Sequence, residues 1–131
     1  FVEDIVKEAT EYLKKVLNTG GIDLQLLGVG VNGHIGYNEP GSERQSSCRV
    51  VSLASTTIER DSLPIGSMGI TLGVGDILNS KKIILLATGD SKAFAVRQAL
   101  KSTPSVENPA SFLVNHECIS IILDNQAASM L

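Results

Sequence analysis

The first part of the chain places apolar residues every three or four positions, whereas several later segments place them in short, nearly continuous runs. The three-four spacing over residues 2–17, with lysines and glutamates in between, predicts an amphipathic helix that ends at Gly20 and Gly21. The run from Ile83 to Ala87 predicts a strand over 82–88 that is covered on both faces of its sheet. Further strands are predicted over 24–29, 50–53, 70–73 and 119–123.

The segments between these strands carry helical or turn patterns. Residues 93–100 predict a helix that Ser91 caps, and short helical turns are predicted over 76–80 and 110–115, with another helix beginning at Asn125. Beyond the strand at 50–53, the stretch up to residue 68 mixes Ser, Thr and charges and indicates no element. Strands that alternate with helices at this spacing predict an α/β fold, an open, mostly parallel sheet of Rossmann-like type with helices on both faces.

In such sheets, ligands bind beyond the carboxyl ends of the strands. Three glycine-bearing loops are expected there, at Gly28–Gly41, Gly73–Gly75 and Gly89–Lys92. The first begins with the spacing GxGxxG, which opens a helix in dinucleotide-binding folds. Here Gly36 and Pro40 interrupt any such helix, and a leucine stands about 20 residues further on, where an acidic residue would bind a ribose. A nicotinamide-binding module is therefore an alternative that only cofactor titration would support.

Composition narrows the function classes. The 131 residues are 43% hydrophobic and 19% charged, which is typical of one folded domain and argues against disorder. With 11 basic and 14 acidic residues the net charge is −3, and the basic residues are scattered, so we expect no nucleic-acid partner. No apolar run approaches the roughly 20 residues of a membrane helix, so we expect a cytoplasmic protein without membrane contact. Cys48 and Cys118 lack metal-ligand spacing, and neither a metal site nor a disulfide framework is predicted.

The loop after the first strand carries a histidine between an amide and an acid. His34 lies two residues after Asn32 and five before Glu39. An imidazole exchanges protons near neutral pH, and a carboxylate bonded to one ring nitrogen would fix its tautomer and leave the other nitrogen to a substrate. Glu39 is the natural partner for that bond. The alternative is a loop histidine whose ring is satisfied by backbone groups.

Residues 27–41, which read LGVGVNGHIGYNEPG, resemble the signature of the glucosamine-6-phosphate deaminase and galactosamine-6-phosphate isomerase family. The agreement continues over 69–73, 76–78, 88–92 and 109–113. The resemblance implies an enzyme that converts a hexosamine 6-phosphate to fructose or tagatose 6-phosphate plus ammonia, without metal or organic cofactor. Ring opening and proton transfer from C2 to C1 are the steps it implies. The substrate stays open between glucosamine and galactosamine 6-phosphate, although residues 69–79 look somewhat closer to the galactosamine enzymes.

The same resemblance implies catalytic roles for three residues of the loop. His34 corresponds to the family's ring-opening acid and base, and Glu39 to the carboxylate that orients it. Asn32 falls where family members have Asp or Asn, and its amide brings no charge to the imidazole. Lys92 corresponds to the lysine that contacts the substrate phosphate, where the start of a helix also favours an anion.

Further binding residues follow from the same resemblance. Gly30 and Gly33 lie in the substrate loop, and Arg60 is a candidate phosphate ligand in a stretch that is shorter here than in the best-known glucosamine-6-phosphate deaminases. The family has an N-terminal portion with a phosphate loop and the acidic residue that moves the C2 proton. Residues 1–131 are therefore expected to be the C-terminal portion of a larger single domain and to be inactive alone.

Two other functions remain as alternatives. The sequence also leaves open whether the protein forms a homo-oligomer. A 6-phosphogluconolactonase-like hydrolase would share the fold and a Gly-His in this loop, but the sequence Asn-Glu-Pro-Gly over 38–41 argues against it. A non-catalytic sugar-phosphate sensor would use the same pocket without turnover. The presence of both His34 and Glu39 favours the enzyme over the sensor.

Overall fold

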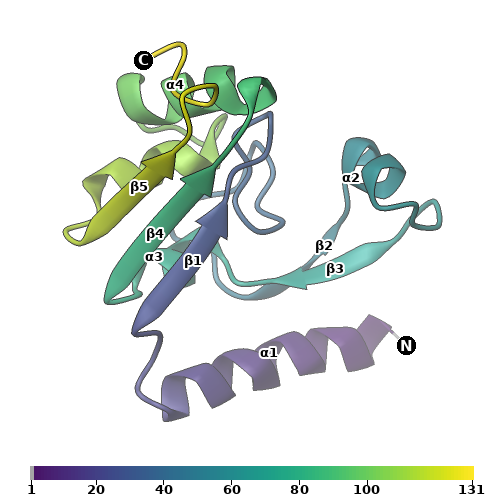
Figure 1. Ribbon diagram of the computed structural model, residues 1–131. Helices are drawn as coiled ribbons and strands as arrows, with labels where there is room; N and C mark the ends of the chain where they lie inside the picture. The colour runs from purple at the N-terminus through teal and green to yellow at the C-terminus, as the bar shows by residue number, and fades with distance from the viewer. Residues whose placement is uncertain (1) are drawn as a thin grey trace.

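The fold is an α/β arrangement built around a parallel sheet (Figure 1). The computed structural model describes residues 2–131. Its elements in chain order are α1 (Val2–Asn18), β1 (Leu24–Gly28), β2 (Arg49–Ser52), α2 (Ser55–Arg60), β3 (Met68–Thr71), α3 (Val74–Leu78), β4 (Lys82–Ala87), the 3₁₀ helix η1 (Asp90–Lys92), α4 (Ala93–Lys101), the 3₁₀ helix η2 (Pro109–Asn115) and β5 (Ile119–Leu123). Strands β1, β4 and β5 pair in parallel in the order β1-β4-β5, and β2 and β3 form a separate antiparallel pair. The predicted α/β class is confirmed.

The core lies on one face of the parallel sheet. The strand register places Leu27, Leu85 and Ile121 side by side, and their side chains point to the same face because alternate residues of a strand do so. Small and apolar residues from α3, α4 and η2 pack against this face, together with the fully buried Ile35 of the loop after β1. These contacts anchor that loop at the carboxyl end of β1.

The other face of the sheet is exposed. Leu24 and Leu26 of β1, Leu86 of β4 and Ile122 of β5 keep 44–62% of their surface accessible. In Figure 1 no helix lies in front of the three arrows of this sheet. The expectation that the β4 strand is covered on both faces is wrong for this chain, because the helices that pack on the sheet among residues 2–131 contribute buried side chains to one face only.

Three local predictions are also corrected. Ser91 lies inside η1 and does not cap a helix, since α4 begins at Ala93 without a side-chain cap. Residues 125–130 form turns and not a helix, and the Asp124 carboxylate accepts the Ala127 N–H at 2.7 Å there. Helix α2 was not predicted, because its few residues are too short to show a period.

The glycine loop at 73–75 lies apart from the other two predicted ligand loops. Strand β3 pairs with β2 and not with the parallel sheet, so this loop starts α3 and packs against the backbone of Ser46. Of the three predicted ligand loops, those after β1 and β4 lie at the carboxyl edge of the parallel sheet. Among residues 2–131, no helix combines the length and the apolar character needed to cross a membrane.

Candidate functional site

The loop after β1 folds tightly around the ring of His34. The N–H of Gly30 donates to the carbonyl of His34 at 2.9 Å, and the N–H of Gly33 donates to the carbonyl of Gly30 at 2.9 Å. A Cβ on Gly30 would collide with the imidazole, and one on Gly33, whose φ is +86°, would collide with the amide of Asn108. Both glycines are therefore required by close packing, which restricts where the imidazole can lie.

Asn38 ties the far end of this loop to the antiparallel strand pair. Its buried side chain donates through Nδ2 to the carbonyls of Ile35 at 2.9 Å and Leu72 at 2.8 Å. Its Oδ1 accepts a hydrogen bond from Nη1 of Arg49 on β2 at 2.9 Å. Every polar atom of this buried amide has a partner, so it holds the backbone next to Glu39 firmly. The sequence prediction did not include this clamp, whose Arg49 and Leu72 partners come from other elements.

Asn32 bridges His34 and Glu39. Nδ2 of Asn32 donates to Oε2 of Glu39 at 2.7 Å, and Oδ1 of Asn32 lies 2.7 Å from Nδ1 of His34. The same carboxylate oxygen of Glu39 lies 3.5 Å from Nδ1. The structure thus brings the three residues together, but the close hydrogen bond to the ring comes from the amide and not from the carboxylate. Glu39 acts on the imidazole mainly through its charge.

These contacts determine the tautomer of the neutral imidazole. An ionised carboxylate only accepts hydrogen bonds, so the NH₂ of Asn32 must face Glu39 and its oxygen must face His34. That oxygen also only accepts, so Nδ1 of the ring carries the proton. In the neutral ring, Nε2 then holds the lone pair and is the nitrogen left to accept a proton from a ligand.

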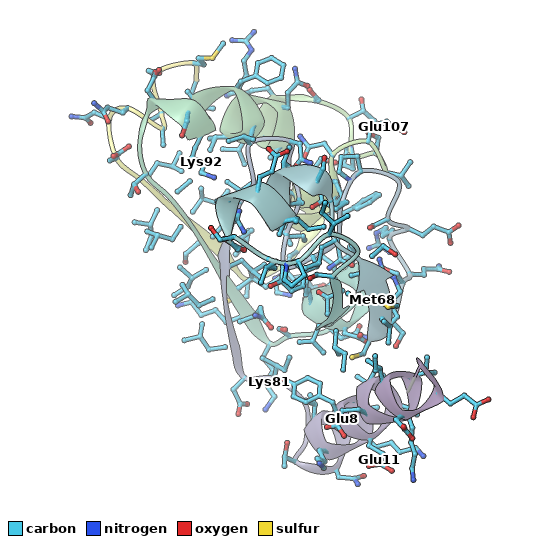
Figure 2. All side chains as sticks on the ribbon, turned by 90° about the vertical axis from the view of Figure 1, so that its right-hand side faces the viewer. Glu8, Glu11, Met68, Lys81, Lys92 and Glu107 are labelled. Carbon is cyan, nitrogen blue, oxygen red and sulfur yellow. The ribbon has the colours of Figure 1, made fainter. Side chains whose placement is uncertain are left out.

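A cavity of about 240 Å³ lies in front of this ring, with the lysine and arginine candidates in its wall. It is lined by Gly28, Val29, Gly30, His34, Gly36, Arg60 and Lys92. Lys92, labelled in Figure 2, comes from η1 after β4, and Arg60 comes from α2. Four of the seven predicted site residues therefore meet in one cavity. Asn32 and Glu39 lie behind His34 and outside the lining, and Gly33 packs against Asn108 instead.

The charges around the cavity shift the proton affinity of the ring. Burial lowers the pKa of His34 below its ordinary value, Glu39 raises it, and the Arg60 and Lys92 cations lower it further. The net effect is a lowered pKa, so the ring is neutral at neutral pH. Arg60 is also paired with its neighbour Asp61, with Nε and Nη2 at 2.8 and 2.9 Å from the two carboxylate oxygens. An anionic ligand in the cavity would compete with Asp61 for this guanidinium.

A larger cavity of about 510 Å³ lies between α1, β1 and β3. Its wall is mostly apolar, with Leu27, Tyr37 and Ile70 among its residues, and none of the predicted site residues lines it. The smaller cavity, with its imidazole and two cations, therefore has the chemistry of the candidate site. Within the described part of the chain, no three His, Cys, Asp or Glu side chains gather as a metal site would require.

Comparisons with known proteins give relatives across the whole chain. The family described as glucosamine-6-phosphate isomerases/6-phosphogluconolactonase matches residues 2–121. A glucosamine-6-phosphate deaminase of Clostridium novyi is 44% identical over 98% of this chain and 56% of its own length. One of Thermoanaerobacter sp. (strain X514) is 38% identical over 98% of this chain and 53% of its own length. The chain spans about half the length of the curated relatives it matches.

Solved structures agree with these matches. A structure described as a monomeric glucosamine-6-phosphate deaminase has a TM-score of 0.89 and 40% identity, over 95% of this chain and 54% of that one. The 6-phosphogluconolactonase of Trypanosoma cruzi has a TM-score of 0.79 and 26% identity, over 100% of this chain and 53% of that one. The sequence resemblance is confirmed: the chain belongs to the glucosamine-6-phosphate isomerase/6-phosphogluconolactonase family.

Proposed function

We propose that this chain carries the ring-opening and phosphate-binding part of a hexosamine 6-phosphate deaminase. The reaction converts glucosamine or galactosamine 6-phosphate to the corresponding ketose 6-phosphate and ammonia. One observation carries the proposal: a single cavity is lined by an imidazole with a free Nε2 and by two cations, Lys92 and Arg60. The relatives named as glucosamine-6-phosphate deaminases support the substrate class.

The geometry suits the first step of this reaction. Nε2 of neutral His34 takes the proton of the anomeric hydroxyl and returns a proton to the ring oxygen as the bond between C1 and that oxygen breaks. Glu39 stabilises the imidazolium that forms in between, because its charge lies 3.5 Å from Nδ1. Lys92 and Arg60 bind the 6-phosphate, with Arg60 leaving Asp61 to do so.

The later proton transfer from C2 to C1 needs a base of its own. The residues that line the cavity include no carboxylate. We propose that the C2 base and the rest of the phosphate site lie in sequence outside these 131 residues, so that this chain alone binds the substrate but does not turn it over. We also propose that residues 1–131 are the C-terminal portion of a larger single domain. The same proposal places the protein in the cytoplasm and includes a homo-oligomer.

A 6-phosphogluconolactonase-like hydrolase is the second candidate, because the Trypanosoma cruzi lactonase shares the fold at 26% identity. Both reactions use a phosphorylated sugar and one proton-transferring group. They differ in product, since the deaminase releases ammonia and the lactonase opens an ester with water. Measurement of ammonia and of lactone loss on the same sample therefore separates them.

The test replaces the matching half of the Clostridium novyi enzyme with this chain and measures ammonia release from both hexosamine 6-phosphates. His34→Gln is expected to lower turnover by about a hundredfold or more, the contribution of one general acid and base. His116→Gln is the control, because His116 binds the carbonyl of Ser80 and does not line the cavity. Equal rates for His34→Gln and the parent chimera would refute the proposal, and lactone hydrolysis without ammonia would favour the hydrolase.

A further inference from the structure

Helix α2 has one buried side chain, and it is a hydroxyl. Thr57 is 1% exposed, whereas its neighbours Ser55 and Thr56 are exposed. A hydroxyl that is removed from water costs free energy unless it finds a hydrogen-bond partner. Valine has almost the same shape and no hydroxyl to remove from water, so it would fill this position without that cost. The buried hydroxyl of Thr57 therefore needs an explanation in the residues around it.

The partner of this hydroxyl is the carboxylate behind the candidate ring-opening histidine. Oγ1 of Thr57 donates to Oε1 of Glu39 at 3.4 Å. The other oxygen, Oε2, already accepts from Nδ2 of Asn32 at 2.7 Å. Each oxygen of the carboxylate thus has its own donor from a different element, and rotation of the carboxylate would break at least one of the two bonds.

We propose that Thr57 is a positioning residue, which holds the Glu39 carboxylate in the orientation that keeps Oε2 beside Nδ1 of His34. Its role in turnover rests on the proposed function, but its effect on His34 does not. Arg60 lies on the same helix, α2, and lines the cavity. The bond from Thr57 therefore also connects α2 to Glu39, which lies behind the imidazole. The contact at 3.4 Å is long for a hydrogen bond, so its removal should have a modest effect.

The test is an NMR titration of the imidazole of His34 in the 131-residue chain. Thr57→Val keeps the shape of the side chain and removes the donor. The carboxylate then keeps only the hydrogen bond from Asn32 and is held less firmly beside Nδ1. Its raising effect on the ring weakens, and the midpoint of His34 should fall by on the order of half a pH unit. Thr57→Ser restores the hydroxyl and should titrate like the parent chain. Thr56→Val changes an exposed threonine on the same helix and should leave the midpoint unmoved.

A double-mutant cycle separates positioning from a general loosening of the fold. If Thr57 acts through the carboxylate, Thr57→Val should cause no further shift in a Glu39→Gln background. The same drop in both backgrounds would overturn the proposal, and so would a Thr57→Val chain that titrates like its parent.

Turnover gives an independent readout in the chimera with the Clostridium novyi enzyme. Thr57→Val should lower kcat severalfold with KM little changed, because the residue does not line the cavity. A raised KM with unchanged kcat would overturn the positioning role. If no variant releases ammonia while the titration shifts as expected, the proposed function fails and the positioning role of Thr57 stands.

Discussion

At the scale of single residues, the environment of His34 decides what chemistry it can do. A free imidazole is half protonated near pH 6.5 and could act as acid or base at neutral pH. In this chain, burial and the two cations of the cavity lower its pKa, while Glu39 limits that decrease. The hydrogen bond from Nδ1 to Oδ1 of Asn32 also determines which ring nitrogen can accept a proton, because it leaves the lone pair on Nε2. The resting ring is therefore a base.

Lys92→Met tests the effect of the cavity cations. The Lys92 charge disfavours the protonated ring, so its removal should raise the pKa of His34, by on the order of half a pH unit, and the protonated form should persist to higher pH. The imidazole NMR titration measures this midpoint. Lys81→Met is the matched control, since Lys81 pairs with Asp23 at 2.6 Å and does not line the cavity. A midpoint that falls or stays unchanged in Lys92→Met would show that the lysine does not act on the ring.

At the scale of elements, close packing between loops holds the antiparallel strand pair in place. Gly73 has φ −70° and ψ 165°, an extended backbone that any residue adopts, so conformational freedom does not explain the glycine. Its α-carbon lies against the backbone of Ser46, and the N–H of Gly75 donates to the carbonyl of Ser46 at 2.9 Å. The glycine is there because a second backbone passes where a Cβ would be.

Gly73→Ala should therefore destabilise the chain. The added methyl group meets a backbone carbonyl that cannot rotate away, and overpacking of this kind costs about 1–3 kcal/mol. Gly28→Ala is the control, because a Cβ there meets open space. Urea denaturation of both variants measures the free energy of unfolding. Equal stability of Gly73→Ala and the parent would mean that the two loops are not packed as described.

Some of these features could be predicted from the sequence and others could not. The relation of His34 to Asn32 and Glu39 could be predicted, because all three lie in one short loop whose glycines and proline constrain it. The role of Thr57 could not be predicted, because it depends on burial against Glu39, which is 18 positions away. Arg60 was a candidate from the family resemblance alone, in a stretch that is shorter here than in the best-known members, and the short helix α2 that carries it was not predicted.

At the scale of the whole molecule, the parallel sheet has one packed face and one exposed apolar face. Adjacent residues of β4 show the contrast: Leu85 is 1% exposed and Leu86 is 44% exposed. A continuous apolar run is the pattern of a strand that is covered on both faces. The curated relatives are about twice as long as the matched region, and within residues 2–131 only one face of the sheet has helices packed on it.

The pair Leu85→Ala and Leu86→Ala tests this one-sided core. Truncation of Leu85 leaves a cavity in the packed face and should cost about 2–5 kcal/mol of unfolding free energy. Truncation of Leu86 removes a side chain that is already largely in contact with water and should cost less than about 1 kcal/mol. Chemical denaturation of the 131-residue chain gives both values. Similar losses for the two variants would contradict an exposed second face.

The amino-acid sequence alone predicted the α/β class, most strands and the histidine loop, because these depend on periodicity and on residues close in sequence. Folding in three dimensions set the remainder: which face of β4 is buried, the separation of the Gly73 loop from the sheet edge, and the meeting of His34, Arg60 and Lys92 around one cavity. Each of these depends on contacts between segments far apart in sequence, and strand pairing and burial create those contacts only when the chain is folded.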